Sequence, residues 1–347
     1  MIRSGETDTA SAALGPSTRR RAALGLMAGA LLAPALGRGQ TSAQTSAQSP
    51  AQTPPPASTS PASAPPSGTK PPGASETLPT GRDLSQRMTT PVFVNGQGPF
   101  NFLVDTGANR SGIASELAAQ LKLPAGQPVS VHGIAAAVVT PTVDIDELRV
   151  GSFRLKLDDA PTFARADLGA DGLIGLDLLH DRVVTLDFRH DRIEVSHRGY
   201  SSLDSLQAIG AVIPARQRFG QLTIIDAEAG RARMTCFIDT GADQSVGNDA
   251  LRRAVQAQVP LDRWLSAQVM IHSATGQSVP GLVALVPRMR IGGVDFTRFG
   301  LAFADLHTFD LWQLHDQPAL LVGMDLLRLF DMVTIDFASR EVVLEKR

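Results

Sequence analysis

The stretch FLVDTGAN, residues 102–109, has a near copy, CFIDTGAD, at residues 236–243. In both copies an apolar, strand-like run ends in a carboxylate, Asp105 or Asp239, followed by a threonine, a glycine and an alanine. The glycine lets the backbone turn where a larger side chain would obstruct it. A single Asp-Thr-Gly is a common turn sequence, whereas two copies in matched contexts supply a pair of equivalent carboxylates.

The match between the two halves of the chain extends well beyond these stretches. Each half repeats a short helix, a β-hairpin, a strand pair around a glycine turn and a closing apolar-glycine motif, in the same order. The paired segments are 115–121 and 249–255, 129–143 and 269–286, 148–153 and 289–296, and 173–179 and 321–327. Further apolar strands follow at 183–195 and 333–344, and Ser115 and Asp249 are predicted to begin the helices, Ser115 as an N-cap. The pattern predicts an internal duplication in a mainly β fold with short helices.

The repeats predict the domain organisation. With 347 residues the chain has room for two domains, and the repeats place them at 88–198 and 210–347, joined by a connector at 199–209. Residues 36–87 are rich in Pro, Ser, Ala and Gln, with almost no large apolar side chains. Such a segment cannot bury enough surface to offset its chain entropy, so it is predicted to be a disordered tether.

Residues 1–35 have the features of an export signal. Three arginines, Arg19–Arg21, precede an apolar run that ends in Ala33-Pro34-Ala35, which predicts cleavage after Ala35. Consecutive arginines are typical of twin-arginine signals. The apolar run is shorter than the roughly 20 residues of a membrane span. We therefore predict an exported protein, periplasmic or secreted, which an uncleaved signal would anchor to the inner membrane.

Charge and cysteine content exclude several other classes. The formal net charge is −2 and no basic stripe occurs, so nucleic acid is not an expected partner. The single cysteine, Cys236, excludes an intramolecular disulfide. It lies three residues before Asp239 without a basic neighbour in sequence, which indicates a buried, inert thiol.

The paired Asp-Thr-Gly-Ala stretches, each followed by an apolar-apolar-Gly motif that contains Gly175 or Gly323, resemble the aspartic peptidases. The alanine after the glycine, the short helix and the closing IGLDLL and VGMDLL motifs are more similar to the retroviral-like (retropepsin-like) branch than to pepsin. The resemblance covers residues 88–347. It implies a bilobal aspartic-protease fold with two retropepsin-like β-barrel lobes, a cleft between them and a flap hairpin above it. Retroviral enzymes use two identical subunits, so this chain is expected to be a monomer that acts as a pseudo-dimer.

Two carboxyl groups side by side can activate water. They cannot both ionise, so they share one proton, and the pair supplies a base for water and an acid for the substrate carbonyl. Asp105 and Asp239 are the predicted catalytic residues, and no metal or cofactor is expected. The resemblance also assigns supporting roles to Thr106, Gly107, Ala108, Thr240, Gly241 and Ala242. The two threonines would join the lobes, and the glycines would let backbone amides approach the carboxylates.

Ala108 and Ala242 also predict the pH range of the dyad. Alanine stands where pepsin-like enzymes usually carry a hydroxyl that could donate to the carboxylate. Fewer donors to the charged form should leave the dyad pKa higher, which predicts an optimum at weakly acidic to near-neutral pH.

Several residues have two interpretations. His132, Gly133 and Ile134 correspond to His272, Ser273 and Ala274, and these sets are either flap tips that contact substrate or turns inherited by duplication. Asp243 is expected on a loop surface. An insertion in the second repeat carries Phe309, Leu311 and Trp312, which either line one end of the cleft or pack on the lobe. The other histidines lack the spacing of a zinc site.

The leading hypothesis is an exported aspartic endopeptidase that cleaves extended peptide or protein substrates. A cleft between β lobes binds such substrates through strand-like backbone hydrogen bonds. Two alternatives use the same features. One is a catalytically inactive peptide-binding module of the same fold, and the other is a structural envelope protein whose tether reaches a partner.

Overall fold

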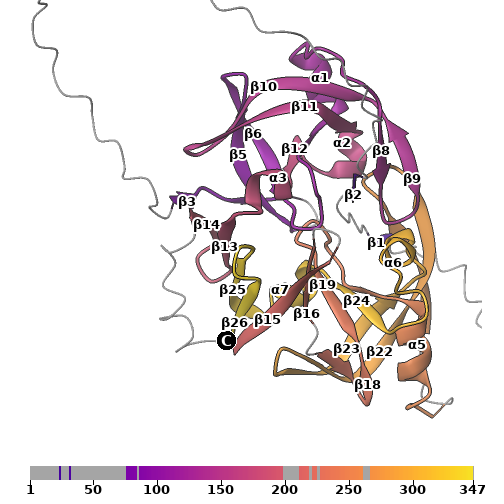
Figure 1. The fold of residues 1–347 in the computed structure, drawn as a ribbon. Helices are drawn as coiled ribbons and strands as arrows, with labels where there is room; N and C mark the ends of the chain where they lie inside the picture. Colours follow the sequence, from indigo (N-terminus) through magenta and orange to yellow (C-terminus); the bar gives the residue numbers. More distant parts are fainter. Residues whose placement is uncertain are drawn as a thin grey trace, which may run out of the picture.

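The computed structural model describes residues 23–24, 31–32, 76–83, 86–197, 211–218, 221–224, 227–260 and 266–346. Within these ranges the chain is mainly β, with two barrel-like lobes, a sheet that joins them and a few short helices. Figure 1 shows the first lobe in indigo to magenta above the second lobe in orange to yellow. The predicted bilobal aspartic-protease architecture is therefore confirmed.

The first lobe is a closed barrel. Its strands follow the order β10-β11-β7-β12-β6-β5-β4, and the additional pairing of β10 with β5 closes the sheet on itself. Val92 and Val94 alternate along β5 with less buried neighbours and fill the interior. The strands of this lobe are β4 (Gly81–Arg82), β5 (Met88–Val94), β6 (Gln97–Val104), β7 (Gly112–Ala114), β8 (Val129–His132), β9 (Ala137–Thr140), β10 (Thr142–Val150), β11 (Phe153–Phe163) and β12 (Gly172–Ile174).

The second lobe repeats this plan in a more open form. The path β22-β23-β20-β24-β19-β16 corresponds to β10-β11-β7-β12-β6-β5, and β17 pairs with β22 where β5 pairs with β10 in the first lobe. Its strands are β16 (Gln221–Ile224), β17 (Ala227–Ala229), β18 (Ala232–Arg233), β19 (Thr235–Ile238), β20 (Val246–Gly247), β21 (Ser266–His272), β22 (Ser278–Ile291), β23 (Val294–Phe303) and β24 (Ala319–Val322).

One antiparallel sheet joins the two lobes. It runs β15-β26-β25-β13-β14-β3, and its central pair is β13 of the first repeat with β25 of the second. Thr185 lies opposite Thr334 at the middle of this pair, and the two buried hydroxyls are 3.1 Å apart. The strands are β3 (Glu76–Leu78), β13 (Arg182–Asp187), β14 (Arg192–His197), β15 (Ala211–Arg218), β25 (Phe330–Asp336) and β26 (Glu341–Lys346). The next-to-last strand of each repeat thus pairs with that of the other repeat.

The helices lie close to their predicted positions, but the predicted N-cap was wrong. The first, α1 (Ser115–Gln120), is preceded by Ala114 and has no side-chain cap, while the Ser115 hydroxyl donates to Glu116. The second, α5 (Asp249–Gln256), is capped by Asn248, which accepts from the Leu251 amide at 2.9 Å. The short helices are α2 (Arg165–Leu168), α3 (Leu176–Leu179), α6 (His307–Leu311) and α7 (Met324–Leu327).

The predicted tether extends too far toward the C-terminus. Residues 76–83 and 86–87 belong to the folded part, because β3 pairs with β14 and β4 pairs with β5. We call residues 76–87 the N-terminal arm. Its few large apolar side chains made it look like the tether, yet backbone pairing and the ion pair between Asp83 and Arg87 hold it in place.

The structure describes only some residues of the predicted export signal and tether, and none of the predicted connector. Most of the predicted tether and all of the connector at 199–209 lie outside the described residues. Of the predicted export signal, β1 (Ala23–Leu24) pairs with β21 and β2 (Leu31–Leu32) pairs with β8. Among the described residues, no helix combines the length and the apolarity that a membrane crossing requires.

Candidate active site

Each predicted catalytic aspartate lies at the end of a strand that is buried between two others. Asp105 follows β6, and its amide donates to the Ile174 carbonyl of the parallel neighbour β12 at 2.9 Å. Asp239 follows β19, and its amide donates to Val322 of β24 at 3.0 Å. Both side chains are buried, at 2% and 3% exposure. The same local structure therefore positions both carboxyl groups.

The two aspartates meet across the lobes. A hydrogen bond joins the Asp105 and Asp239 side chains. A methyl group at Gly107 would overlap the Asp239 carboxyl group, and one at Gly241 would overlap the Asp105 carboxyl group. Each glycine thus makes room for the aspartate of the other repeat, which is the physical reason for the Asp-Thr-Gly order.

Backbone amides hold each carboxylate. Asp105 Oδ1 accepts from the amides of Gly107 and Ala108 at 2.8 and 3.1 Å. The Asp239 Oδ1 atom accepts from Gly241 and Ala242 at 2.9 and 3.1 Å. These bonds point each carboxyl group toward its partner and satisfy one oxygen of each.

The two threonines form a reciprocal network between the lobes. The Thr106 amide donates to the Thr240 hydroxyl at 3.0 Å, and the Thr240 amide donates to the Thr106 hydroxyl at 3.1 Å. The Thr106 hydroxyl donates to the Ile238 carbonyl, and the Thr240 hydroxyl donates to the Val104 carbonyl. The two threonines and the residues that supply the two carbonyls are all buried, so the network fixes the separation of the aspartate loops.

A second pair of aspartates supports these loops. The Ser111 hydroxyl donates to Asp177 at 2.7 Å and accepts from the Gly175 amide. In the second lobe Ser245 donates to Asp325 and accepts from the Gly323 amide. The repeat pattern indicates Gly175 and Gly323 but gives no role to the aspartates two residues later. Their matching places in the IGLDLL and VGMDLL motifs were the available signal.

Burial raises the pKa of Asp105 to about 6. The amides of Gly107 and Ala108, the positive charge of Arg87 and the bond with Asp239 partly oppose this rise. The direction agrees with the predicted pH range, but the principal cause is burial. Ala108 itself acts through its backbone amide, which lowers this pKa.

Two hairpins occupy the predicted flap positions, and we call them flap 1 (β8 and β9) and flap 2 (β21 with the first residues of β22). Ile134 of flap 1 packs in a cluster of the second lobe with Phe237 and Leu306. Ala274 of flap 2 packs in a cluster of the first lobe. A methyl group at Gly133 would lie 2.7 Å from the Ser273 hydroxyl, so the tips of the flaps touch. Each flap is thus docked on the opposite lobe.

The two flap histidines have different partners. The His132 Nδ1 atom of flap 1 lies 3.0 Å from Nε2 of His307 on α6, and the rings are stacked at an interplanar angle of 12°. The His307 amide donates to the Ile134 carbonyl at 2.8 Å. In flap 2, His272 Nδ1 lies 2.7 Å from the Ser278 hydroxyl within the same hairpin. Only one member of this duplicated pair bridges the lobes.

Arg87 is buried beside the aspartate loops, although it lies within the predicted tether. It is 1% exposed and forms an ion pair with Asp83. It also donates to the Gly241 carbonyl at 3.1 Å and to the Leu168 carbonyl at 2.7 Å. A lone arginine next to a Pro/Ser-rich segment carries no signal for such contacts, which arise only from the fold.

Asp243 is partly exposed, but one of its carboxyl oxygens is buried, which the expected position on a loop surface did not predict. Its Oδ1 atom is buried and has no hydrogen-bond partner among the described residues. Burial raises the pKa of Asp243 to about 7, and Asp325 and Asp83 add to this rise while Arg87 opposes it. Asp243 therefore adds a buried carboxyl oxygen to the second lobe at the position where the first repeat has Asn109.

The insertion of the second repeat packs on its lobe. Phe309 and Trp312 are buried, and Trp312 stacks on Phe237 with ring centroids 3.9 Å apart. Leu311 is partly buried against the same cluster. Cys236 is fully buried, as predicted, and burial raises the pKa of its thiol.

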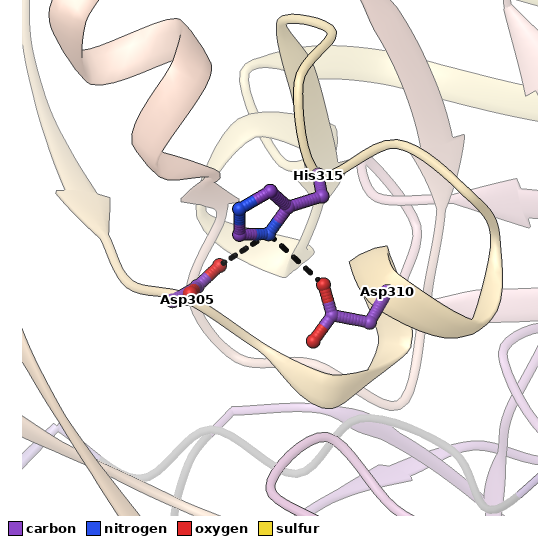
Figure 2. A group of neighbouring side chains, drawn as sticks. All are labelled: Asp305, Asp310 and His315. Carbon is purple, nitrogen blue, oxygen red and sulfur yellow. Dashed lines mark hydrogen bonds and ion pairs between the residues drawn. The ribbon is translucent and has the colours of Figure 1, made fainter.

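Three exposed side chains of the same insertion gather at the surface, as Figure 2 shows. The Nδ1 atom of His315 lies 3.1 Å from Asp310 Oδ1 and 3.8 Å from Asp305 Oδ1. Each of these side chains is more than half exposed. The arrangement is accounted for by ordinary surface ion pairs, which contribute little to stability.

Comparison with known families agrees with this geometry. Residues 90–178 match the family model described as aspartyl protease. The matched segment contains the Asp105 loop, flap 1 and the Gly175 motif, and it supports an aspartyl protease family for this chain. No curated protein matches the chain.

Proposed function

We propose that the protein is an aspartic endopeptidase whose single active site combines Asp105 from the first lobe with Asp239 from the second. The hydrogen bond between these two carboxyl groups carries the proposal, because two buried, adjacent carboxyls hold one shared proton. That protonation state offers a base and an acid within reach of one water molecule.

Hydrolysis would proceed without a covalent intermediate. The ionised carboxylate takes a proton from water, whose oxygen bonds to the scissile carbonyl carbon. The neutral carboxyl gives its proton to the carbonyl oxygen. The resulting gem-diol loses its C–N bond as the newly protonated carboxyl gives its proton to the amine nitrogen. One gem-diol hydroxyl returns its proton to the other carboxylate, so the pair again holds one proton. The four amides that hold the Oδ1 atoms keep both groups oriented throughout.

The expected substrate is an extended peptide segment. The flap strands have edges able to pair with another strand, as the pairings of β21 with β1 and of β8 with β2 illustrate. The apolar composition of the flaps favours apolar residues beside the cut. Export through the twin-arginine signal is part of this proposal, and N-terminal sequencing of the periplasmic protein should then begin at Leu36.

Cleavage of a mixed peptide library by the full chain tests the proposal. We expect Asp105→Asn and Asp239→Asn each to lower the rate at least about 10³-fold, since each removes the acid–base pair. Asp316→Asn is the matched control, because that side chain is 89% exposed. Peptide retention without cleavage by the unaltered protein between about pH 3 and 8 would instead support the inactive binding module.

A further inference from the structure

Arg87 contacts both lobes beside the aspartate loops. Its guanidinium donates to the carbonyl of Leu168 at the end of α2 in the first lobe and to the carbonyl of Gly241 in the second. Within the N-terminal arm, the Nε atom of Arg87 donates to Asp83 Oδ2 at 2.7 Å. A planar fork with five donors can satisfy three acceptors in different directions, which a lysine ammonium cannot reproduce.

The contact with Gly241 connects Arg87 to both aspartates. The Gly241 amide donates to Asp239, and the Gly241 Cα approaches the Asp105 carboxyl group so closely that a methyl group would not fit. A shift of the Gly241 peptide would therefore move one carboxylate donor and open the contact between the lobes.

The positive charge of Arg87 acts on two carboxyl groups. It lowers the pKa of Asp105 and of Asp243, while Asp83 partly neutralises it and raises the pKa of Asp243. A buried cation at this position favours the ionised form of the dyad against the effect of desolvation.

From these contacts we infer that Arg87 is a positioning residue for the proposed reaction. It holds the Asp239 loop through the Gly241 carbonyl, ties that loop to the first lobe and supplies a buried positive charge beside the dyad. This inference rests on the proposed function. It makes the N-terminal arm a component of the active site.

The pH–rate profile of Arg87→Met tests the charge. Loss of the cation raises the pKa of both dyad steps, so both limbs of the profile should move to higher pH by about one unit. Arg87→Lys keeps the charge and should leave both limbs in place while kcat falls several-fold, because the fork is lost. Arg233→Met, which removes an exposed charge on β18, is the control and should leave the profile unmoved.

Asp83→Asn provides an opposite and independent test. It leaves the charge of Arg87 unneutralised, so both limbs should move to lower pH. Unmoved limbs in both Arg87→Met and Asp83→Asn would overturn the inference, even if both variants melt at lower temperature. Should Arg87→Met fail to fold, the other two variants still decide it: the limbs of Arg87→Lys should stay in place while kcat falls, and those of Asp83→Asn should move to lower pH.

A measurement without turnover separates this inference from the proposed function. Carboxyl ¹³C NMR titration of the full chain, assigned through Asp105→Asn and Asp239→Asn, reports the dyad directly. A protein that cleaves nothing, yet shows a dyad pKa raised in Arg87→Met and lowered in Asp83→Asn, refutes the peptidase and retains the role of Arg87. Dyad titration that is the same in all three proteins refutes the role of Arg87.

Discussion

The two lobes are nearly identical at the aspartate loops and differ in the groups that touch those loops from outside. Both repeats hold their aspartate with two amides, cross their threonines and anchor the loop through a serine and a buried aspartate. Asp243 stands where the first repeat has Asn109, and α2, which approaches flap 2 as α6 approaches flap 1, carries no histidine. The geometry of the two aspartate loops is symmetric, whereas the contacts made to those loops from outside are not.

The flaps show the same contrast. Flap 1 is fixed to the second lobe by His132 and His307, while the tip of flap 2 is held by hydrogen bonds among Ser273, Thr275 and Gln277. A duplicated hairpin has thus acquired a bridge between lobes on one side and an internal network on the other. The two flaps are therefore expected to open under different conditions.

The largest predicted effect tests the symmetry of the centre. Gly107→Ala and Gly241→Ala each add a methyl group that would overlap the aspartate carboxyl group of the other repeat. Both variants should lose activity by at least about 10³-fold, because the dyad is forced apart. Gly300→Ala, whose added methyl group would lie 4.0 Å from its nearest neighbour, controls for the backbone effect of losing a glycine. Unequal losses at the two central glycines would show that the lobes do not contribute equally.

The second-largest effect is expected on stability, when either of the two crossed threonines is substituted. Thr106→Val and Thr240→Val each remove one hydroxyl and leave a buried amide without its acceptor, at a cost of about 2–4 kcal/mol in unfolding free energy. Thr185→Val in the interlobe sheet breaks one hydroxyl–hydroxyl contact and should cost about 1 kcal/mol. Urea titration measures all three. A Thr185 variant as unstable as the other two would contradict the special role of the network.

The next prediction exchanges the residue types at equivalent positions of the two loops, Asp243 and Asn109. The pKa of Asp243 is raised, so its ionisation destabilises the fold increasingly as the pH rises from about 4 through about 7. Asp243→Asn should therefore stabilise the protein at pH 8 by about 1–2 kcal/mol, a figure reduced for its partial exposure, and have little effect at pH 4. Asn109→Asp is the reverse substitution, and denaturant unfolding at both pH values compares them. A stability gain that is the same at pH 4 would refute this account.

The smallest predicted effect separates the flaps. Burial and the neighbouring His307 lower the pKa of His132, so the docked flap 1 favours a neutral imidazole. Protonation as the pH falls from about 7 to 5 should then weaken its docking. Hydrogen exchange, corrected for intrinsic rates, should rise several-fold in β8 and β9 but not in β21. In His132→Gln this difference between pH 7 and 5 should disappear, and its persistence would contradict the histidine bridge.

Much of the fold could be read from the repeat. The offset of 134 residues between Asp105 and Asp239, together with the matching hairpins and closing motifs, predicted two similar β lobes because duplicated patterns fold into duplicated cores. The helix caps and the arm were less accessible. Serine is a common N-cap residue, but Ser115 is the first residue inside the helix. The arm is held by backbone pairing, which amino-acid composition does not reveal.

In the candidate site, too, some features follow from local sequence and others only from tertiary structure. Local sequence determined that each Asp-Thr-Gly-Ala would form a turn with its carboxylate held by its own amides, since these contacts span only two or three residues. Tertiary structure alone decided that the two carboxyls meet, that Arg87 donates to the Gly241 carbonyl beside them and that burial raises the pKa of Asp243. These outcomes depend on contacts between residues far apart in the chain and on the exclusion of water, which arise only once both lobes have packed.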